Sequence, residues 1–385
     1  MPQARAIDSD VCVVGAGIVG LAHAFEARAR GLSVTVVERS GCAVGASVRN
    51  FGHVIVSAMG EGAALDCALD ARERWLSLGR RAGLEIHEAG TLIVARADDE
   101  LAVMDRIAAD ERRGARLITT RELGRLVPLP VSELVGGLHA GLDLRVDPRR
   151  AVAALAALLD DDPHARVIWN APVHEIDPGL VRSAAADVRA PLVIVCPGPD
   201  LGWLGPELTP RRDGMTRCKL QMLRVAAPAG SRYRPALLTA LSLVRYPGYS
   251  DQPAADVLRT RIEAERPELV AAGVHLIVTQ LPGGDLLLGD THEYGGTVSP
   301  FSDERLDELV LTEARRLLGA EVLEVRQRWH GVYPSAPGHP FLIAEPLPGV
   351  AVVEIVSGVG MTTALGLAPR TFDALTQAGS TVVLS

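Results

Sequence analysis

The residues Asp10-Val11-Cys12-Val13-Val14-Gly15-Ala16-Gly17-Ile18-Val19-Gly20 decide the fold of this chain. A run with helical spacing follows as far as Gly31, and a second apolar run over residues 32–37 ends in Glu38. This order is typical of a strand, a glycine turn, a helix, a second strand and an acidic residue. Gly15 permits the tight turn, Gly17 lets the backbone approach a pyrophosphate, and Gly20 lets the helix pack closely on the sheet. The stretch therefore predicts a dinucleotide site in a Rossmann-like α/β fold, with the pyrophosphate at the helix N-terminus.

Glu38 indicates which dinucleotide the turn accepts. An acidic side chain about 20 residues beyond the glycines accepts hydrogen bonds from an adenosine ribose. An acid here disfavours NADP, whose ribose carries a 2′-phosphate. The alternative is a glycine turn that binds nothing, and the agreement of strand, helix and acid favours the dinucleotide.

Composition excludes several classes of function. The chain has 385 residues, of which 48% are apolar and 22% charged, with a formal charge of −8. This balance gives no support for nucleic-acid binding, and no apolar run is long enough to predict a membrane span. The five cysteines form no close pair and no metal-binding spacing, so we expect reduced thiols, no metal, and a cytoplasmic protein.

The rest of the chain predicts a sheet assembled from separated segments. We expect helices over residues 60–82, 98–113, 151–159 and 303–318, and a hairpin of residues 275–280 and 285–290. We expect a proline-rich, irregular stretch over 329–343, and a last strand over 350–356 that meets a second glycine turn and a closing helix. One NAD needs no second helix start, whereas a flavin dinucleotide has a ring that benefits from one. We therefore assign residues 1–80, 145–215 and 325–385 to an FAD-binding domain, and 81–144 and 216–324 to a β-rich α+β substrate domain.

Three motifs in this order resemble the D-amino acid oxidase superfamily, which includes glycine and sarcosine oxidases. They are the Gly15–Gly20 turn with Glu38, the loop Gly45-Ala46-Ser47-Val48-Arg49-Asn50-Phe51-Gly52, and the turn Ser357-Gly358-Val359-Gly360-Met361-Thr362. The resemblance spans the whole chain and implies FAD. Arg49-Asn50-Phe51-Gly52 and Gly289-Asp290-Thr291-His292-Glu293 look closer to a subgroup associated with phosphonate breakdown, for which N-methylated 2-aminoethylphosphonate is a candidate substrate.

The motifs and the resemblance together imply a set of cofactor-binding residues. These are Gly15, Gly17, Ile18, Val19, Gly20, Glu38, Arg39, Ser47, Asn50, Gly52, Val173, Gly198, Gly331, Gly358, Gly360, Met361 and Thr362.

The chain departs from the family pattern in the segment Trp329-His330-Gly331-Val332-Tyr333-Pro334. Family members with a covalent flavin carry a cysteine there, so we expect FAD to be bound non-covalently. The glycine-oxidase pattern carries an arginine for the substrate carboxylate where this chain has Tyr333. A tyrosine cannot form the bidentate charged pair. An ordinary α-amino acid is therefore disfavoured, and the acidic end of the substrate must be held elsewhere.

The resemblance implies hydride transfer from the carbon beside an amine to the flavin, followed by hydrolysis of the imine. The electrons pass to oxygen or to a carrier, with an oxidase favoured. The rivals are a D-amino acid dehydrogenase or oxidase, an NAD-dependent dehydrogenase, and a flavin-binding subunit without turnover. Catalytic candidates are Asn50, His53 and Tyr333, although no base is required if the amine binds neutral. Candidates for holding the substrate are Arg49, Lys219, Gln221, Arg245, Tyr246, Tyr249, His292 and Tyr333.

Overall fold

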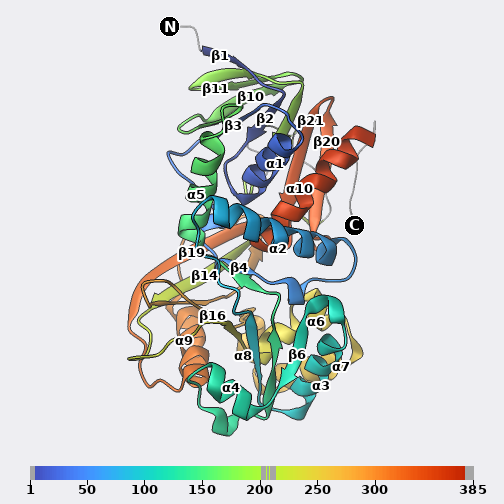
Figure 1. Cartoon of the computed structure of the whole chain (residues 1–385). Helices are drawn as coiled ribbons and strands as arrows, with labels where there is room; N and C mark the ends of the chain where they lie inside the picture. The colour runs from blue at the N-terminus through green and yellow to red at the C-terminus, as the bar shows by residue number, and fades with distance from the viewer. Residues whose placement is uncertain (1–4, 201–204, 206–207, 209–213, 378–385) are drawn as a thin grey trace.

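The computed structural model describes residues 5–200, 205, 208 and 214–377. Figure 1 shows that they form two lobes, and that the first described strand and the last described helix both belong to the upper one. Of the segments predicted for the FAD-binding domain, residues 1–4, 201–204, 206–207, 209–213 and 378–385 lie outside the described residues.

The upper lobe contains a six-stranded sheet that is parallel except for one edge strand. Its order is β20 (Phe341–Leu347), β21 (Val350–Ile355), β13 (Leu192–Val195), β2 (Val11–Val14), β3 (Val34–Val37) and β9 (Ala165–Ile168). The residues of β2, β3 and β21 are all buried, as expected for parallel strands that are covered on both faces. The predicted α/β fold, assembled from distant segments, is confirmed.

Two different layers cover this sheet. One face packs on α1 (Ile18–Ala29), α5 (Pro148–Asp160) and α10 (Gly360–Gln377), and α2 (Ala63–Arg81) packs on α10. The other face packs on a four-stranded sheet with the order β1 (Arg5–Asp8), β12 (Ala186–Arg189), β11 (Leu180–Ser183) and β10 (Val173–Asp177). Helix α5 begins at Pro148, where a proline is tolerated, and Asp147 caps it.

The lower lobe contains a nine-stranded sheet. Its strands are β18 (Glu293–Gly295), β14 (Thr216–Val225), β17 (Leu286–Gly289), β16 (Ile277–Gln280), β15 (Ala236–Leu238), β5 (Thr91–Ala95), β7 (Gly136–Ala140) and β6 (Ala115–Ile118), with β19 (Val325–Ser335) beside β14. The helices of this lobe are α3 (Asp98–Ala108), α4 (Thr120–Leu126), α6 (Pro247–Ser250), α7 (Pro253–Glu265), α8 (Pro267–Ala271) and α9 (Glu304–Leu318). A two-stranded ladder of β4 (His53–Val54) and β8 (Leu144–Arg145) completes the strands of the described residues.

The stretch over residues 329–343 is not irregular, so that prediction is wrong. Most of it belongs to the long strand β19 and to the start of β20. Pro334 argued against a strand here, because a proline lacks the N–H that a central strand needs. The ladder of β19 runs along β14 on one side only, where a proline is tolerated. Residues 325–335, assigned from the sequence to the FAD-binding domain, thus pair within the sheet of the lower lobe.

Among the described residues, no helix is both long and apolar enough to cross a bilayer. All five cysteines are described, and each is a free thiol.

Candidate active site

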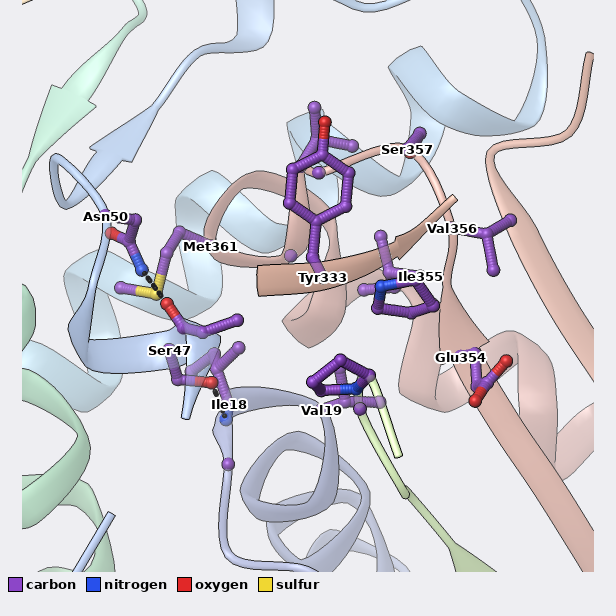
Figure 2. A pocket seen from close by; sticks show the side chains of 18 of the residues that line it. Ile18, Val19, Ser47, Asn50, Tyr333, Glu354, Ile355, Val356, Ser357 and Met361 are labelled. Atoms are coloured by element: carbon purple, nitrogen blue, oxygen red, sulfur yellow. Dashed lines mark hydrogen bonds between the residues drawn. The ribbon is translucent and has the colours of Figure 1, made fainter. Parts of the chain in front are cut away.

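A cavity of about 1040 Å³ lies where the two lobes meet. Its volume is at the upper end of the range for small-molecule sites, roughly 300–1,000 Å³. In the view of Figure 2, Ile18, Ser47 and Asn50 lie on one side of it, Ser357 and Glu354 on the other, and Tyr333 between them.

The first glycine turn has the shape that the sequence predicts. Gly15 has φ +104°, and a Cβ on it would lie 2.6 Å from the carbonyl oxygen of Cys196. A Cβ on Gly20 would lie 1.9 Å from the carbonyl oxygen of Gly15, so helix α1 touches the turn directly. Gly17 caps α1, and the N–H of Ile18 donates to Ser47 Oγ at 3.0 Å. The positive end of the α1 dipole therefore faces the cavity.

Glu38 lies at the end of β3 and faces this turn. Its Oε2 accepts from the N–H of Ala16 at 2.9 Å, and its Oε1 accepts from the N–H of Ser40 at 3.0 Å. Each carboxylate oxygen has a second lone pair, so ribose hydroxyls can still bind there. Beside it, Arg39 forms an ion pair with Asp200.

The second glycine turn brings another helix start beside the first. A Cβ on Gly360, the first residue of α10, would lie 3.7 Å from Ile18 Cγ2 on α1. Gly358 has φ +75°, and its position against the ring of Tyr333 leaves no space for a side chain. The two helix starts, which lie far apart in the sequence, thus open into the same cavity.

Asn50 and His53 form structural hydrogen bonds, although the buried Nδ1 of His53 has no partner among the described residues. The amide of Asn50 donates to the carbonyl of Ala46 at 2.8 Å and accepts from the N–H of Gly52 at 2.7 Å, which fixes the loop. His53 Nε2 lies 2.7 Å from Thr91 Oγ1. Burial, with Arg145 nearby, lowers the pKa of His53 to about 3, so its ring is neutral near pH 7.

Glu354 supplies an unpaired acid in the cavity wall. It lies near the end of β21, is 2% exposed, and neither carboxylate oxygen has a hydrogen-bond partner among the residues that the structure describes. Burial raises its pKa to about 8, so the group is largely a neutral carboxyl at pH 7. A neutral carboxyl offers one donor and one acceptor to a polar ligand.

A second group of polar residues lines the lower end of the cavity. Arg245 is half-buried, and its Nη2 donates to the hydroxyl of Tyr294 at 2.9 Å. Tyr294 and Tyr333 lie opposite Cys218 on either side of β14, so the two phenols share one face of the sheet with it. Asp290, His275 and His292 complete the group, and His275 Nε2 lies 3.1 Å from Asp290 Oδ1.

Because successive side chains of a strand point to opposite faces of the sheet, two of the predicted substrate-binding residues on β14 do not face the cavity. Lys219 and Gln221 alternate with Cys218 and Leu220 on β14 and point away from the cavity. Lys219 bonds to Glu293 and to the carbonyl of Phe301, and Gln221 bonds to Asp307 on α9.

Most of the other predicted residues come together around the cavity. Among the described residues that line it are Arg49, Arg245, Tyr246, His292, Tyr333 and each predicted cofactor contact except Gly52. Gly52 instead packs on the carbonyl of Val146, and Tyr249 bonds to Ser57 in the protein interior.

Sequence reasoning missed Asp290, His275 and Glu354 as site residues. A signal existed for the first two: the predicted hairpin of residues 275–280 and 285–290 places His275 and Asp290 side by side at its open end. Glu354 gave only a weak signal, one acid inside an apolar strand.

A family model described as "DAO: FAD dependent oxidoreductase" matches residues 10–373. The chain belongs to this family. It is therefore an oxidoreductase that uses FAD. The cavity fits that cofactor because Gly15 and Gly17 carry no side chain where a pyrophosphate would lie, and because Glu354 offers an unpaired polar group.

Individual relatives are more distant. The anaerobic glycerol-3-phosphate dehydrogenase of Escherichia coli (strain K12) has one polypeptide that is 31% identical over 180 residues, which are 46% of this chain and 32% of that polypeptide. The match thus spans about a third of that relative's length.

Two solved structures share the fold along nearly the whole chain. The L-proline dehydrogenase from P. horikoshii is 19% identical with a TM-score of 0.77, covering 98% of this chain and 96% of that one. The glycine oxidase from Geobacillus kaustophilus is 20% identical with a TM-score of 0.75, covering 98% and 97%. At these identities the likeness is one of fold.

Proposed function

We propose that the enzyme oxidises a small amine that carries an acidic group, by oxidative deamination or demethylation. The leading substrate is 2-aminoethylphosphonate or its N-methyl form. The observation that carries the proposal is Arg245, whose guanidinium lines the cavity beside the hydroxyl of Tyr294. A guanidinium can hold a phosphonate or carboxylate through two parallel hydrogen bonds.

The surroundings of Arg245 support an acid-binding role. Although burial opposes it, the pKa of Arg245 is raised by the neighbouring Tyr333, Tyr294 and Asp290, so the guanidinium stays charged. Tyr294 is 53% exposed, and its hydroxyl can donate a further hydrogen bond to an anion. In this proposal the cation that binds the acidic group of the substrate is Arg245, which comes from a different segment than Tyr333.

The chain's own residues bind and orient the substrate in this proposal. FAD, when bound at the two helix starts, supplies the hydride acceptor. Arg245 and Tyr294 hold the acidic group, and the apolar side chains of Leu220, Ile277 and Met361 in the cavity wall limit the access of water. Hydrolysis of the released imine then gives an aldehyde or keto acid, together with ammonia from a primary amine or an amine from an N-methylated one.

We propose molecular oxygen rather than a carrier as the final electron acceptor. Peroxide formation during aerobic turnover tests this choice, and its absence together with rapid dye reduction favours a dehydrogenase.

The deciding experiment is an anaerobic screen of flavin reduction. The probes are 2-aminoethylphosphonate, its N-methyl form, N-methylglycine and a set of D-amino acids. We expect the phosphonates to bleach the flavin fastest. A fast reaction with D-alanine and none with the phosphonates would favour the D-amino acid alternative.

A matched pair of variants links the screen to Arg245. Arg245→Gln should raise KM for the phosphonate amine roughly 10- to 100-fold, the effect of losing a charge-assisted hydrogen bond. Arg224→Gln is the control, because Arg224 lies on β14 and pairs with Asp285, away from the described lining. Equal effects of the two substitutions would contradict the role of Arg245.

A further inference from the structure

Asp290 and His275 form a buried pair at the lower end of the cavity. His275 precedes β16 and Asp290 follows β17, and their backbones exchange two hydrogen bonds of 3.3 Å. The side chains of His275 and Asp290 are 3% and 6% exposed, respectively. His275 Nε2 approaches Asp290 Oδ1 to 3.1 Å, yet no donor in the described part of the chain is aligned on that oxygen. The carboxyl therefore has unused acceptor capacity inside the cavity.

The groups that face Asp290 come from four segments of the lower lobe. They are Cys218 on β14, Arg245 and Tyr246 after the short helix η5 (Ala240–Val244), His275 before β16, and His292 beyond β17.

Only Arg245 among these groups is charged near pH 7. Burial lowers the pKa of both His275 and His292 well below the usual range, and it raises the pKa of Cys218 to about 11 and that of Tyr246 further still. Burial also raises the pKa of Asp290 to about 7, although Arg245 opposes this shift. The site thus places one fixed cation next to one group that titrates near neutrality, which suits exchange of a proton with a ligand.

We propose that Asp290 accepts the proton of the substrate ammonium group while Arg245 and Tyr294 hold its acidic end. The proposal rests on the function proposed above. In this step the N–H bond of the ammonium breaks, an O–H bond forms on Asp290, and the nitrogen regains its lone pair. Nothing is oxidised or reduced. The neutral amine that results is the form that can release a hydride from the neighbouring carbon.

His275 lies directly against this carboxyl. Its Nδ1 lies 3.5 Å from Ser242 Oγ and its Nε2 faces Asp290. A neutral imidazole bears a single N–H, so it can present a donor or an acceptor to the carboxyl without adding charge.

A divalent metal is the alternative ligand of this cluster. Potential ligand atoms of His275, Asp290 and His292 lie within 4.8 Å of one another. His292 Nδ1 lies 2.8 Å from the carbonyl of Gly273, a bond that would direct its Nε2 to a metal. However, the guanidinium of Arg245 is close enough to perturb the pKa of all three groups, and a fixed cation opposes binding of a second one. The charges therefore favour a zwitterionic substrate.

The test uses the FAD-loaded enzyme and whichever amine of the anaerobic screen reduces it fastest. The wild-type rate of flavin reduction should rise tenfold per pH unit below about pH 7 and then level off, because Asp290 is then ionised. With Asp290→Asn the rate at pH 7 should fall at least roughly 100-fold, in line with the loss of a general base. The loss should shrink as the pH approaches the pKa of the free amine, about 10.

Binding of ethylphosphonate, measured by the change in flavin absorbance, provides a readout separate from turnover. This probe has an acidic group but no amine, so Asp290→Asn should change its affinity less than twofold, whereas Arg245→Gln should weaken it at least tenfold. The matched control is Asp285→Asn, which removes a buried carboxyl from the same hairpin and should leave the pH profile of reduction unchanged.

Several outcomes would overturn the proposal. One is a rate with Asp290→Asn that equals the wild-type rate, or that is reduced equally at every pH. Another is a stoichiometric divalent metal in the purified enzyme that Asp290→Asn removes. If Asp290→Asn does not retain FAD, the wild-type profile decides alone, because a rate that climbs steadily to about pH 10 excludes an internal base near pH 7. Failure of every amine to reduce the flavin would instead refute the proposed function.

Discussion

Glu354 should make the flavin-free protein less stable as the pH rises. The carboxyl is buried without a partner, and burial raises its pKa to about 8. An acid whose pKa is higher in the folded state holds more protons there than in the unfolded chain. The free energy of unfolding therefore falls as the pH rises from about 4.5 and is constant again above about 8. The difference between the pKa values in the unfolded and folded states lowers the free energy of unfolding by at most roughly 5 kcal/mol.

The perturbation is Glu354→Gln, which keeps the shape and removes the ionisation. Urea unfolding of flavin-free protein at pH 5, 7 and 9 gives the free energies. At pH 5 the variant should lie within about 1 kcal/mol of wild type, and at pH 9 it should be more stable by about 3–5 kcal/mol. Glu324→Gln is the control, because that side chain is 72% exposed and should leave the pH dependence unchanged. A constant difference between Glu354→Gln and wild type from pH 5 to 9 would refute the reasoning.

Three further substitutions and one substrate test probe the cofactor and substrate ends. Gly20→Ala puts a methyl group 1.9 Å from the carbonyl of Gly15 and should cost about 3 kcal/mol or more, seen as a lower Tm; a wild-type Tm would contradict the packing. Gly358→Ala should cost about 1–2 kcal/mol for its left-handed backbone and also displace Tyr333, detected as an altered flavin spectrum. Glu38→Ala should weaken FAD binding roughly 10- to 100-fold in equilibrium dialysis, and unchanged occupancy would argue against the ribose contact. Because Tyr333 cannot form a bidentate ion pair with an α-carboxylate, glycine and D-alanine should be poor substrates in a peroxide assay. Efficient turnover of either would overturn that expectation.

The glycine turn of the candidate site could be predicted from the sequence because its close backbone contacts allow only glycine at certain positions. Gly15 and Gly20 leave no space for a side chain, and a stretch that needs glycine at fixed spacing is readable without a structure. The hairpin of β16 and β17 was likewise readable, since two apolar runs flank a Pro-Gly-Gly turn.

The substrate half was less predictable because strand pleating depends on a register that the sequence does not reveal. Lys219 and Cys218 are adjacent in the chain, yet they face opposite sides of β14, and only the pairing with Tyr294 and Tyr333 shows which side forms the cavity. Glu354 was missed for a related reason. A single acid in an apolar strand forms no recognisable sequence motif, and only the structure shows that its carboxyl is buried without a hydrogen-bond partner among the described residues.

The order of the six-stranded sheet affects how the protein forms during synthesis. Strand β2 comes from the first residues of the chain and β21 from the last part, and only β13 lies between them. At about 5–20 residues per second, the ribosome needs tens of seconds to complete β21 and α10 after β2 has emerged. During that interval α1 lacks its partner helix α10 and the sheet lacks β21, so the nascent chain exposes apolar surface suited to chaperones. A cavity that both helix starts border is therefore complete only after α10 has been translated.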